Sequence, residues 1–421
     1  MKYAINTLDD FAVAGRTVLC RIDINSPLGP DGTLADVTRI RGCAPTVAEL
    51  AQAGARVALL AHQGGDLEYH NYASTEPHAA VLADLVGRPV AFVDDVCGPA
   101  ARAAVQGLGD GEVLLLDNVR FCAEELTLFE NKLKLSPAEQ ARTLVVRKLA
   151  PLAELYVCDA FAAAHRSQPT LVGFEQLLPS AMGRLFEREY ENLARLREAP
   201  ARPCVFLLGG TKIQEAFPMM AAALRDGTVD QVLTAGLVAN VMLVAAGADI
   251  GPASLEFIRQ SQLEPYIDES KRLLAEHGDR IVLPTDLAVA VDGARREVAV
   301  VDLPVAEQIV DVGARTIADY AARVAACGTV FANGPAGVFE KPETEYGTKA
   351  LWTAMADCPG FSALGGGDSV RAVNRFGLAD SFDYICTAGG AMVQFMSGKP
   401  MPVIEALKDS AKRFAKAGAR P

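Results

Sequence analysis

The chain has 421 residues, of which 50% are hydrophobic and 22% are charged, and its formal net charge at pH 7 is −12. This length exceeds what one hydrophobic core normally supports, so two domains are expected. The acidic balance argues against nucleic acid as a partner, because proteins that bind it carry a basic surface. No apolar signal core follows Met1 and no stretch of about 18 uninterrupted apolar residues occurs, so we expect a cytoplasmic protein with no membrane partner.

The cysteines indicate neither a disulfide framework nor a metal site. Nine are present, an odd number, and no two are spaced Cys-x-x-Cys. Several lie in apolar runs, which is typical of buried free thiols in a reducing compartment. No spacing of Cys or His resembles that of a zinc site.

Short apolar runs alternate with longer segments of helical periodicity, which is typical of βαβ units around a parallel sheet. Strands are predicted in the first half at 17–24, 56–61, 90–93, 112–116 and 155–159. In the second half they are predicted at 203–208, 229–234, 280–283, 329–332, 361–364 and 384–387. Helices are predicted at 45–53, 79–85, 218–224, 317–326 and 369–376. We therefore expect an α/β fold with two doubly wound, Rossmann-like parallel-sheet domains joined by a hinge helix, and a cleft between them.

The segment 182–198 is helical in pattern, highly charged, and followed by Pro200 and Pro203. We interpret it as a connector, the alternative being a solvated surface helix of a single domain. The predicted division is 1–180 for a first domain, 181–200 for the connector, and 201–399 for a second domain. A basic amphipathic helix is predicted at 403–419; it could cap either domain, and we assign the segment 400–421 to the first.

Charged and polar side chains lie at or beside the ends of the predicted strands in the first half. They are Arg21, Asp23, Asn25, Arg39, His62, Arg120 and Arg166. Ligands of parallel sheets bind beyond the carboxyl ends of the strands. Because arginine binds carboxylate and phosphate oxygens bidentately, this half is predicted to hold a small, multiply charged anion.

The second half carries glycine-rich loops instead, at 209–212, 333–337 and 365–368. Glycines let backbone amides approach a phosphate, and Lys212 adds a mobile positive charge. The glycines at 365–367 precede a helical pattern that begins at Ser369, and the N-terminus of a helix attracts anions. The sequence therefore predicts nucleotide binding in this half and phosphoryl transfer between two substrates held on separate domains.

Seven motifs, in order along nearly the whole chain, resemble those of the phosphoglycerate kinase family. They are Arg21-Ile-Asp-Ile-Asn25-Ser-Pro, Asp36-Val-Thr-Arg39-Ile-Arg41, Asp117-Asn-Val-Arg120-Phe121, Asp159-Ala-Phe-Ala-Ala-Ala-His165-Arg166, Gly209-Gly-Thr-Lys212, Asn333-Gly-Pro-Ala-Gly-Val-Phe-Glu340 and Gly365-Gly-Gly-Asp368-Ser369. The segments 62–64, 162–168 and 236–240 resemble the archaeal-type branch. The resemblance implies a kinase that reversibly transfers a phosphoryl group from ATP to the carboxylate of 3-phosphoglycerate, giving 1,3-bisphosphoglycerate and ADP, with Mg²⁺ as cofactor. It places the protein in glycolysis or gluconeogenesis, and we expect a monomer.

The resemblance also implies roles for individual residues. The acceptor would be held by Arg21, Asp23, Asn25, Arg39, His62, Arg120 and Arg166. The nucleotide would be held by Gly209, Gly210, Lys212, Asn333, Gly334, Glu340, Gly365, Gly366, Gly367, Asp368 and Ser369, with Glu340 at the ribose and Asn333 on the adenosine side. The expected catalytic set is Arg39, Lys212, Gly366 and Gly389. Asp368 is the expected Mg²⁺ ligand, the alternative being a helix N-cap.

The chain also departs from the family pattern. Gly65 stands where the family usually has an arginine, and Asp66 follows it; Ala216 stands where many relatives have a second lysine, and Ala388 where a glycine is common. Gly65 and Asp66 leave open a paralogous kinase of a related carboxylic acid as well as the 3-phosphoglycerate enzyme. A non-catalytic nucleotide-binding relative is a further alternative. The physiological direction and the preference for ATP or GTP also stay open. A dehydrogenase is excluded because no Gly-x-Gly-x-x-Gly follows the first strand.

Overall fold

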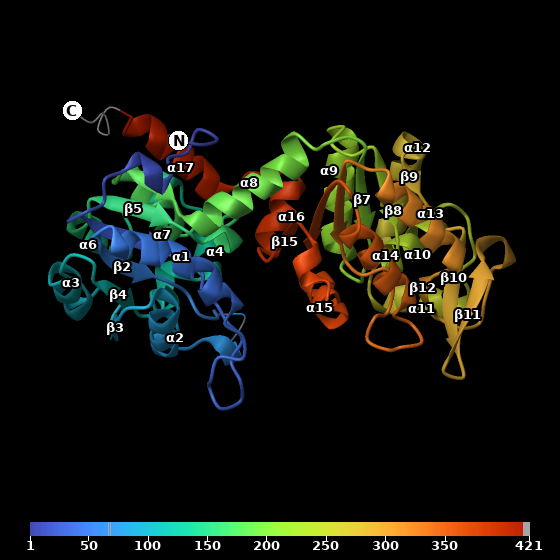
Figure 1. The fold of residues 1–421 in the computed structure, drawn as a ribbon, viewed down its shortest axis with the longest axis horizontal. Coiled ribbons are helices and arrows are strands. Elements are labelled where there is room, and N and C mark those ends of the chain that lie inside the picture. The colour runs from blue at the N-terminus through green and yellow to red at the C-terminus, as the bar shows by residue number, and fades with distance from the viewer. Residues whose placement is uncertain (66, 68, 416–421) are drawn as a thin grey trace. The chain divides into compact units, whose positions relative to one another are not determined.

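The computed structural model describes residues 1–65, 67 and 69–415. Its contacts divide the chain into two compact units (Figure 1). Unit 1 comprises Met1–Glu191 together with the chain from Pro400 onward, and unit 2 comprises Asn192–Lys399. The boundary falls inside the helix α8 (Arg184–Glu198), and the segment predicted as a connector is helical from Arg184 to Glu198.

A six-stranded parallel sheet forms the centre of unit 1, in the order β3-β4-β2-β1-β5-β6. Its strands are β1 (Thr17–Arg21), β2 (Arg56–Leu60), β3 (Val90–Val93), β4 (Val113–Leu116), β5 (Leu155–Cys158) and β6 (Ser180–Met182). Its helices are α1 (Thr38–Gln52), α2 (Glu76–Val86), α3 (Pro99–Gln106), α4 (Thr127–Leu133), α5 (Pro137–Gln140), α6 (Leu144–Leu149), α7 (Pro169–Val172) and α17 (Pro402–Arg413). Strands β1, β4 and β5 are buried at every position, as expected of parallel strands covered on both faces.

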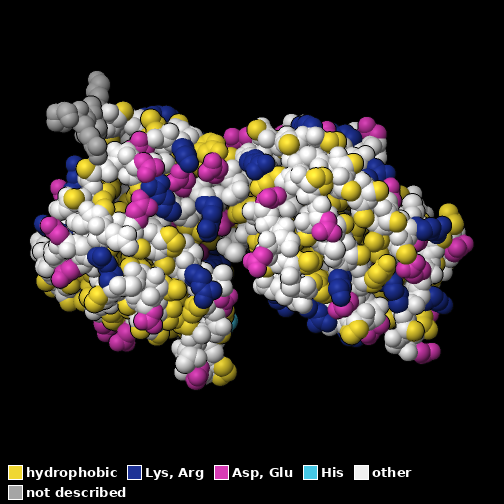
Figure 2. Space-filling model, viewed as in Figure 1, with side chains coloured by type: hydrophobic (Ala, Val, Ile, Leu, Met, Phe, Trp, Pro, Cys, Tyr) yellow, Lys and Arg dark blue, Asp and Glu magenta, His cyan; other side chains and the backbone are white. Residues whose placement is uncertain are grey.

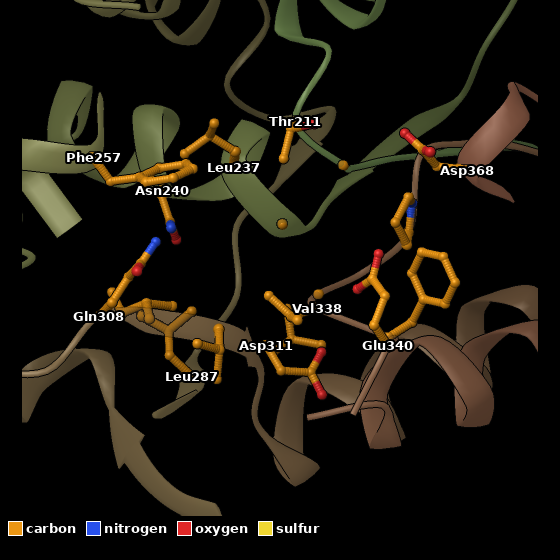
Figure 3. Close-up of a pocket in the computed structure, with 18 of the residues that line it drawn as sticks. Thr211, Leu237, Asn240, Phe257, Leu287, Gln308, Asp311, Val338, Glu340 and Asp368 are labelled. Atoms are coloured by element: carbon orange, nitrogen blue, oxygen red, sulfur yellow. The ribbon is translucent and has the colours of Figure 1, made fainter. Parts of the chain in front are cut away.

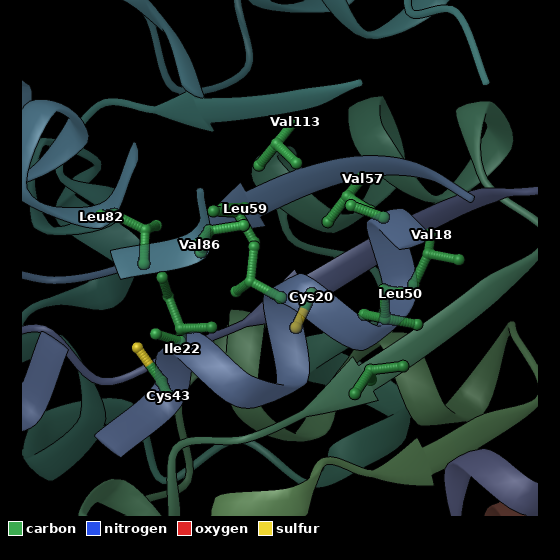
Figure 4. Packing of buried hydrophobic residues seen from close by; sticks show 14 of the residues in the cluster. Val18, Cys20, Ile22, Cys43, Leu50, Val57, Leu59, Leu82, Val86 and Val113 are labelled. Carbon is green, nitrogen blue, oxygen red and sulfur yellow. The ribbon is translucent and has the colours of Figure 1, made fainter. Parts of the chain in front are cut away.

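The core on one face of this sheet shows how the sequence pattern produces the packing. Figure 4 shows Cys20 of β1, and Ile22 just after that strand, beside Cys43 and Leu50 of α1. The buried positions of α1 recur every three or four residues, so one stripe of the helix faces the sheet. The helix begins at Thr38, seven residues before Pro45, where the pattern predicted its start. Arg39 therefore lies in the first turn of a helix.

Unit 2 contains a second six-stranded parallel sheet, in the order β15-β14-β13-β7-β8-β9. Its strands are β7 (Cys204–Leu208), β8 (Gln231–Thr234), β9 (Ile281–Val282), β13 (Thr329–Asn333), β14 (Phe361–Gly365) and β15 (Tyr384–Cys386). The helices are α9 (Ile213–Arg225), α10 (Gly236–Ala245), α11 (Pro252–Gln260), α12 (Pro265–His277), α13 (Ala314–Ala325), α14 (Tyr346–Ala356), α15 (Gly367–Phe376) and α16 (Gly390–Met396). Trp352 and Tyr320 are buried in its core.

The two parallel sheets confirm the predicted fold class, and each predicted strand forms within a few residues of its expected bounds. A three-stranded antiparallel sheet was not predicted. It consists of β10 (Asp286–Val291), β11 (Ala294–Ala299) and β12 (Ile309–Val312). Asp292 and Gly293 join β10 to β11, both with positive φ, which is the turn that a two-residue hairpin favours. The short edge strand β6 was also missed.

The helix α17 packs on unit 1. The amide of Val403 donates to the carbonyl of Ala164, and the hydroxyl of Ser410 donates to the carbonyl of Leu178. Of the predicted segment 403–419, residues 416–419 lie outside the described part of the chain. Among the described residues, no helix is both long and apolar enough to cross a membrane. Acidic and basic side chains are interspersed over the visible face of each unit (Figure 2).

Candidate active site

The charged set of unit 1 gathers at the carboxyl ends of neighbouring strands. Arg21 ends β1, His62 follows β2, and Arg120 lies in a short 3₁₀ helix (Val119–Phe121) after β4. Because β1, β2 and β4 are adjacent in the sheet, these ends meet at one edge. The predicted residues Asp23 and Asn25 continue from β1 into the same edge.

Asp23 and Asn25 organise this edge through their side chains. Asp23 is buried, and its carboxylate accepts a hydrogen bond of 2.8 Å from Nη1 of Arg39 and one of 3.2 Å from the amide of Asn25. The side-chain oxygen of Asn25 accepts from the amide of Gly64 at 2.9 Å. Asp23 therefore orients the Arg39 side chain, and Asn25 fastens the loop that carries His62.

His62 lies in the field of four arginines. Burial lowers the pKa of its ring well below the usual value, and the charges of Arg120, Arg21, Arg39 and Arg166, in that order, lower it further. These are the arginines that the sequence predicted, so the structure brings the set together around one neutral imidazole. A cluster of fixed positive charge is a site for a multiply charged anion.

Arg120 occupies the space beside Gly65. Its guanidinium donates to the carbonyl of Gly64, and a Cβ placed on Gly65 would lie 2.8 Å from Nη1 of Arg120. The hydroxyl of Tyr72 donates to the carbonyl of Arg120 at 2.6 Å, which fixes its backbone. Gly65 is thus the residue that leaves room for Arg120. Asp66, the other departure noted at this loop, lies outside the described residues.

The predicted arginines differ in accessibility. The side chains of Arg39 and Arg166 are 36% and 30% exposed, whereas Arg21 is almost completely buried. Arg166 pairs with Glu130 of α4 at 3.5 Å, an ion pair that an incoming anion would compete with. Arg39 and Arg166 are therefore the members of the set that are open to a ligand, and Arg21 lies beneath them.

In unit 2 the loops after β7 and β13 pack backbone against backbone. The amide of Gly209 donates to the carbonyl of Asn333, and that of Gly210 to the carbonyl of Pro335. A Cβ on Gly334 would lie 2.2 Å from the carbonyl oxygen of Gly209, so no side chain fits there. Gly209 and Gly334 are therefore required by this close approach of the loops, whether or not a ligand is bound.

These loops and the start of α15 enclose a small recess. It is lined by Gly209, Gly210, Thr211, Lys212, Glu215, Asn333, Gly334, Gly366, Gly367, Asp368 and Ser369. Ser369 ties two loops together, since its hydroxyl accepts from the amide of Gly334 at 2.8 Å. Gly366 has a φ of 91° and caps α15, and a Cβ on Gly367 would meet open space. The recess therefore offers a helix N-terminus and exposed backbone to an anion.

Three charged residues line the recess, namely Lys212, Glu215 and Asp368. Lys212 is exposed just before α9 and forms no ion pair with any described residue. Asp368, in the first turn of α15, pairs with Arg371 at 2.8 Å and is partly exposed. Within the described chain, no group of three or more His, Cys, Asp or Glu side chains is placed to hold a metal.

A cavity of about 390 Å³ adjoins the recess (Figure 3). Gly210, Thr211 and Asp368 line both, so the two are immediate neighbours. Much of the remaining lining is apolar, including Leu237, Phe257, Leu287, Ile309 and Val338. In Figure 3 the amides of Asn240 and Gln308 point toward each other at one end, and the Glu340 carboxylate points into the space. Oδ1 of Asn240 is buried with no hydrogen-bond partner in the described structure.

Several lining residues were missed by the sequence reasoning. Leu237 and Asn240 come from α10, Phe257 from α11, Leu287 from β10, and Gln308 directly precedes β12. The signal that could have located part of this wall was the Asp-Gly turn of the unpredicted hairpin. An apolar wall gathered from four separate segments leaves no compact motif in the sequence.

Three of the predicted site residues lie outside the lining of the larger cavity. Asn333 lines the recess and not the larger cavity, and its expected place on the adenosine side stays a prediction. Gly389 caps α16 but lies among the lining residues of neither space. Gly365 is buried, and a Cβ there would lie 2.1 Å from the sulfur of Met392, so the Met392 side chain would have to move to admit any other residue.

The comparisons with known proteins agree with this geometry. Residues 8–399 match the profile of the phosphoglycerate kinase family. The phosphoglycerate kinase of Methanothermobacter thermautotrophicus is 44% identical over 411 residues, which cover 97% of this chain and 98% of the relative. That of Halobacterium salinarum is 43% identical over 410 residues, covering 96% of this chain and all of the relative. The crystal structure of the Pyrococcus horikoshii phosphoglycerate kinase is similar with a TM-score of 0.86, at 37% identity over 97% of this chain and 100% of that chain.

Proposed function

The chain belongs to the phosphoglycerate kinase family and is an ATP-dependent phosphotransferase acting on 3-phosphoglycerate in glycolysis, and we propose that its two clusters bind the two substrates. The acceptor binds in unit 1, at the arginines around His62. The nucleotide binds in unit 2, along the cavity and the recess. The observation that carries this division is that a largely apolar cavity and a glycine-lined recess beside Lys212 share lining residues.

In unit 1, Arg39 and Arg166 are proposed to bind the anionic ends of 3-phosphoglycerate, because they are the more exposed arginines. Arg120 supplies a third positive charge beside His62. Asp23 orients Arg39 and can accept from the substrate hydroxyl. Guanidinium groups suit carboxylate and phosphate because their planar donors match two oxygens at once.

In unit 2 the base is proposed to lie between the apolar walls of the cavity, with the Glu340 carboxylate accepting from ribose hydroxyls. The phosphates then extend into the recess, where the amides at the start of α15 and the Lys212 ammonium meet them. Backbone donors at a helix N-terminus, joined by a lysine, are a common arrangement for phosphate.

Mg²⁺ is proposed as the metal that accompanies the nucleotide. It prefers one or two carboxylates, with phosphate oxygens and water completing the shell, so the carboxylate of Asp368, with Glu215 also lining the recess, fits this donor set. Binding would require Asp368 to exchange its ion pair with Arg371. When bound, the metal neutralises phosphate charge.

No side chain needs to act as a covalent nucleophile. The substrate carboxylate attacks the terminal phosphorus of ATP, or ADP attacks the acyl phosphate in reverse, and the protein stabilises charge on the moving group. Arg39 and Lys212 are the proposed sources of that stabilisation. The monomeric state and the cytoplasmic location expected from the sequence stay predictions.

Addition of MgADP is expected to alter amide exchange in unit 2 alone. Protection should rise at 209–216, 333–340 and 365–370, where the loops line the recess, and at 237–240 and 308–312, where the cavity wall lies. Hydrogen exchange followed by mass spectrometry measures this. Protection by MgADP confined to the first 170 residues would overturn the assignment. In a separate experiment, 3-phosphoglycerate alone should protect the loops around residues 62 and 120.

Gly65→Ala is expected to raise the KM for 3-phosphoglycerate by about threefold to tenfold, with little change in KM for ATP. The added methyl group would press on the end of the Arg120 side chain, which is flexible enough to move without unfolding the protein. Gly109→Ala, in an exposed loop of unit 1 where a Cβ meets only the Glu112 side chain at 3.4 Å, serves as the matched control. Unchanged KM in Gly65→Ala would show that the position of Arg120 is unimportant for the acceptor.

A further inference from the structure

Beneath the anion cluster, four buried side chains form one continuous chain of hydrogen bonds. Oγ1 of Thr170 lies 2.9 Å from Oε2 of Glu125, and Nε of Arg21 lies 3.1 Å from Oγ1 of Thr170. Nη2 of Arg21 lies 3.1 Å from Nδ1 of His62. Glu125 and Thr170 are 0% exposed, Arg21 1% and His62 6%. The proposed roles of the substrate ligands do not account for this chain.

The direction of the hydrogen bond between Arg21 and His62 follows from the chemistry of the two groups. An arginine can only donate, so Nδ1 of His62 accepts, and a neutral ring then carries its proton on Nε2. This conclusion does not depend on the ionisation of Glu125, whose pKa burial raises to about 7 against the charge of Arg21. A proton on Nδ1 would point one donor at another.

The buried guanidinium is anchored on every side. Its Nη1 donates to the carbonyl of Ile22 at 2.6 Å, so each of its three nitrogens has an acceptor inside the protein. The hydroxyl of Thr170 can accept from Arg21 and donate to Glu125 at once, which links the cation to a buried carboxylate. The linkage holds the Arg21 side chain in one orientation.

We propose that Arg21 is a positioning residue and not an acceptor ligand: anchored through Thr170 and Glu125, it holds His62 as the neutral tautomer with its proton on Nε2. His62 then donates a hydrogen bond to an anionic oxygen of the acceptor. The opposite tautomer would present a lone pair to that oxygen and repel it. The proposal rests on the assignment of the acceptor to the cluster around His62.

Thr170 is the residue at which to test the proposal, because it is remote from solvent and its backbone contacts survive substitution. Its amide donates to Oε1 of Glu125, and its carbonyl accepts from the hydroxyl of Tyr156. Thr170→Val removes only the bridging hydroxyl at nearly constant shape, whereas Thr170→Ser keeps it. Thr170→Val should raise the KM for 3-phosphoglycerate about tenfold with kcat and the KM for ATP little changed, and Thr170→Ser should behave as the parent.

The tautomer itself is measured by ¹⁵N NMR of histidine-labelled protein without substrate. The chain has five histidines, and loss of one ring signal in His62→Gln assigns the relevant one. In the parent and in Thr170→Ser, Nδ1 should be unprotonated and Nε2 protonated, and Thr170→Val should show a mixture of tautomers. A proton on Nδ1 in the parent, or Val and Ser variants that are alike in both the spectrum and the KM, would overturn the proposal. A parent protein that does not turn over 3-phosphoglycerate would count against the assigned reaction, while the spectrum still decides the tautomer.

Discussion

Lys212→Ala is expected to lower kcat about 100-fold or more, because the ammonium group stabilises charge that develops only as the phosphoryl group moves. Lys212 is exposed, borders the recess, and forms no ion pair with any described residue. Its charge is therefore not engaged in holding the fold, and the midpoint of thermal unfolding should change little. Steady-state kinetics with both substrates saturating measure the effect.

The matched control is Lys271→Ala. Lys271 is an exposed lysine on α12 that pairs only with Asp268, one turn away, among the described residues. Its removal should leave kcat and both KM values as they are. Near-normal turnover in Lys212→Ala would remove this lysine from the catalytic set and leave the amides of α15 as the main contacts of the transferred group.

Arg39→Ala is expected to lower kcat by a similar factor, about 100-fold, since the guanidinium is placed to neutralise charge on the acceptor side of the transfer. Here the structure also predicts a loss of stability. Asp23 is buried and would keep the amide of Asn25 but lose its ion pair with Arg39, which costs about 1 to 3 kcal/mol for a buried carboxylate oxygen left without a donor. Kinetics and thermal unfolding should both be measured.

Two further variants separate the contributions at this position. Arg39→Lys keeps the charge but not the two-pronged geometry, so it should restore much of the stability and less of the rate. Arg41→Ala, on the exposed face of the same helix, should leave kcat unchanged. If Arg39→Ala raised only the KM for 3-phosphoglycerate, Arg39 would be an acceptor ligand without a part in catalysis.

The parallel sheets could be predicted from the sequence because their strands are largely apolar runs separated by helical segments. Strand β1 is an example, with five buried residues between polar turns. The antiparallel sheet could not be predicted with the same rule. Strand β11, Ala-Arg-Arg-Glu-Val-Ala, has hardly any buried positions, and only its turn at Asp292 and Gly293 marks it as part of a hairpin. A rule based on apolar runs overlooks such a strand.

The site was predictable where it depends on residue chemistry and not where it depends on packing. The arginines around His62 and the glycines of the recess follow from charge and backbone freedom, and the structure brings both sets together. That Arg21 lies below the cluster and Arg39 at its surface depends on which side chains the sheet buries. Spacing along the chain does not contain this information.

The departures from the family pattern also find structural explanations. Gly65 leaves space that the Arg120 guanidinium fills, so the loop keeps a positive charge near His62 without an arginine at position 65. Ala216 is buried in α9, so its side chain lies in the core and not beside a substrate. Neither observation favours a different acceptor, and the family membership agrees with 3-phosphoglycerate.

The central claim is that the protein phosphorylates the carboxylate of 3-phosphoglycerate. It is tested most directly by ADP release from MgATP across a panel of small carboxylic acids, with 3-phosphoglycerate, its dephosphorylated form and non-hydroxylated analogues at matched concentrations. The account predicts rapid release of ADP with 3-phosphoglycerate and no release without an acceptor. When the phosphate of the acceptor is missing, kcat/KM should fall strongly, because the arginine cluster then has one anionic group fewer to bind. Release with another acid, and none with 3-phosphoglycerate, would contradict it.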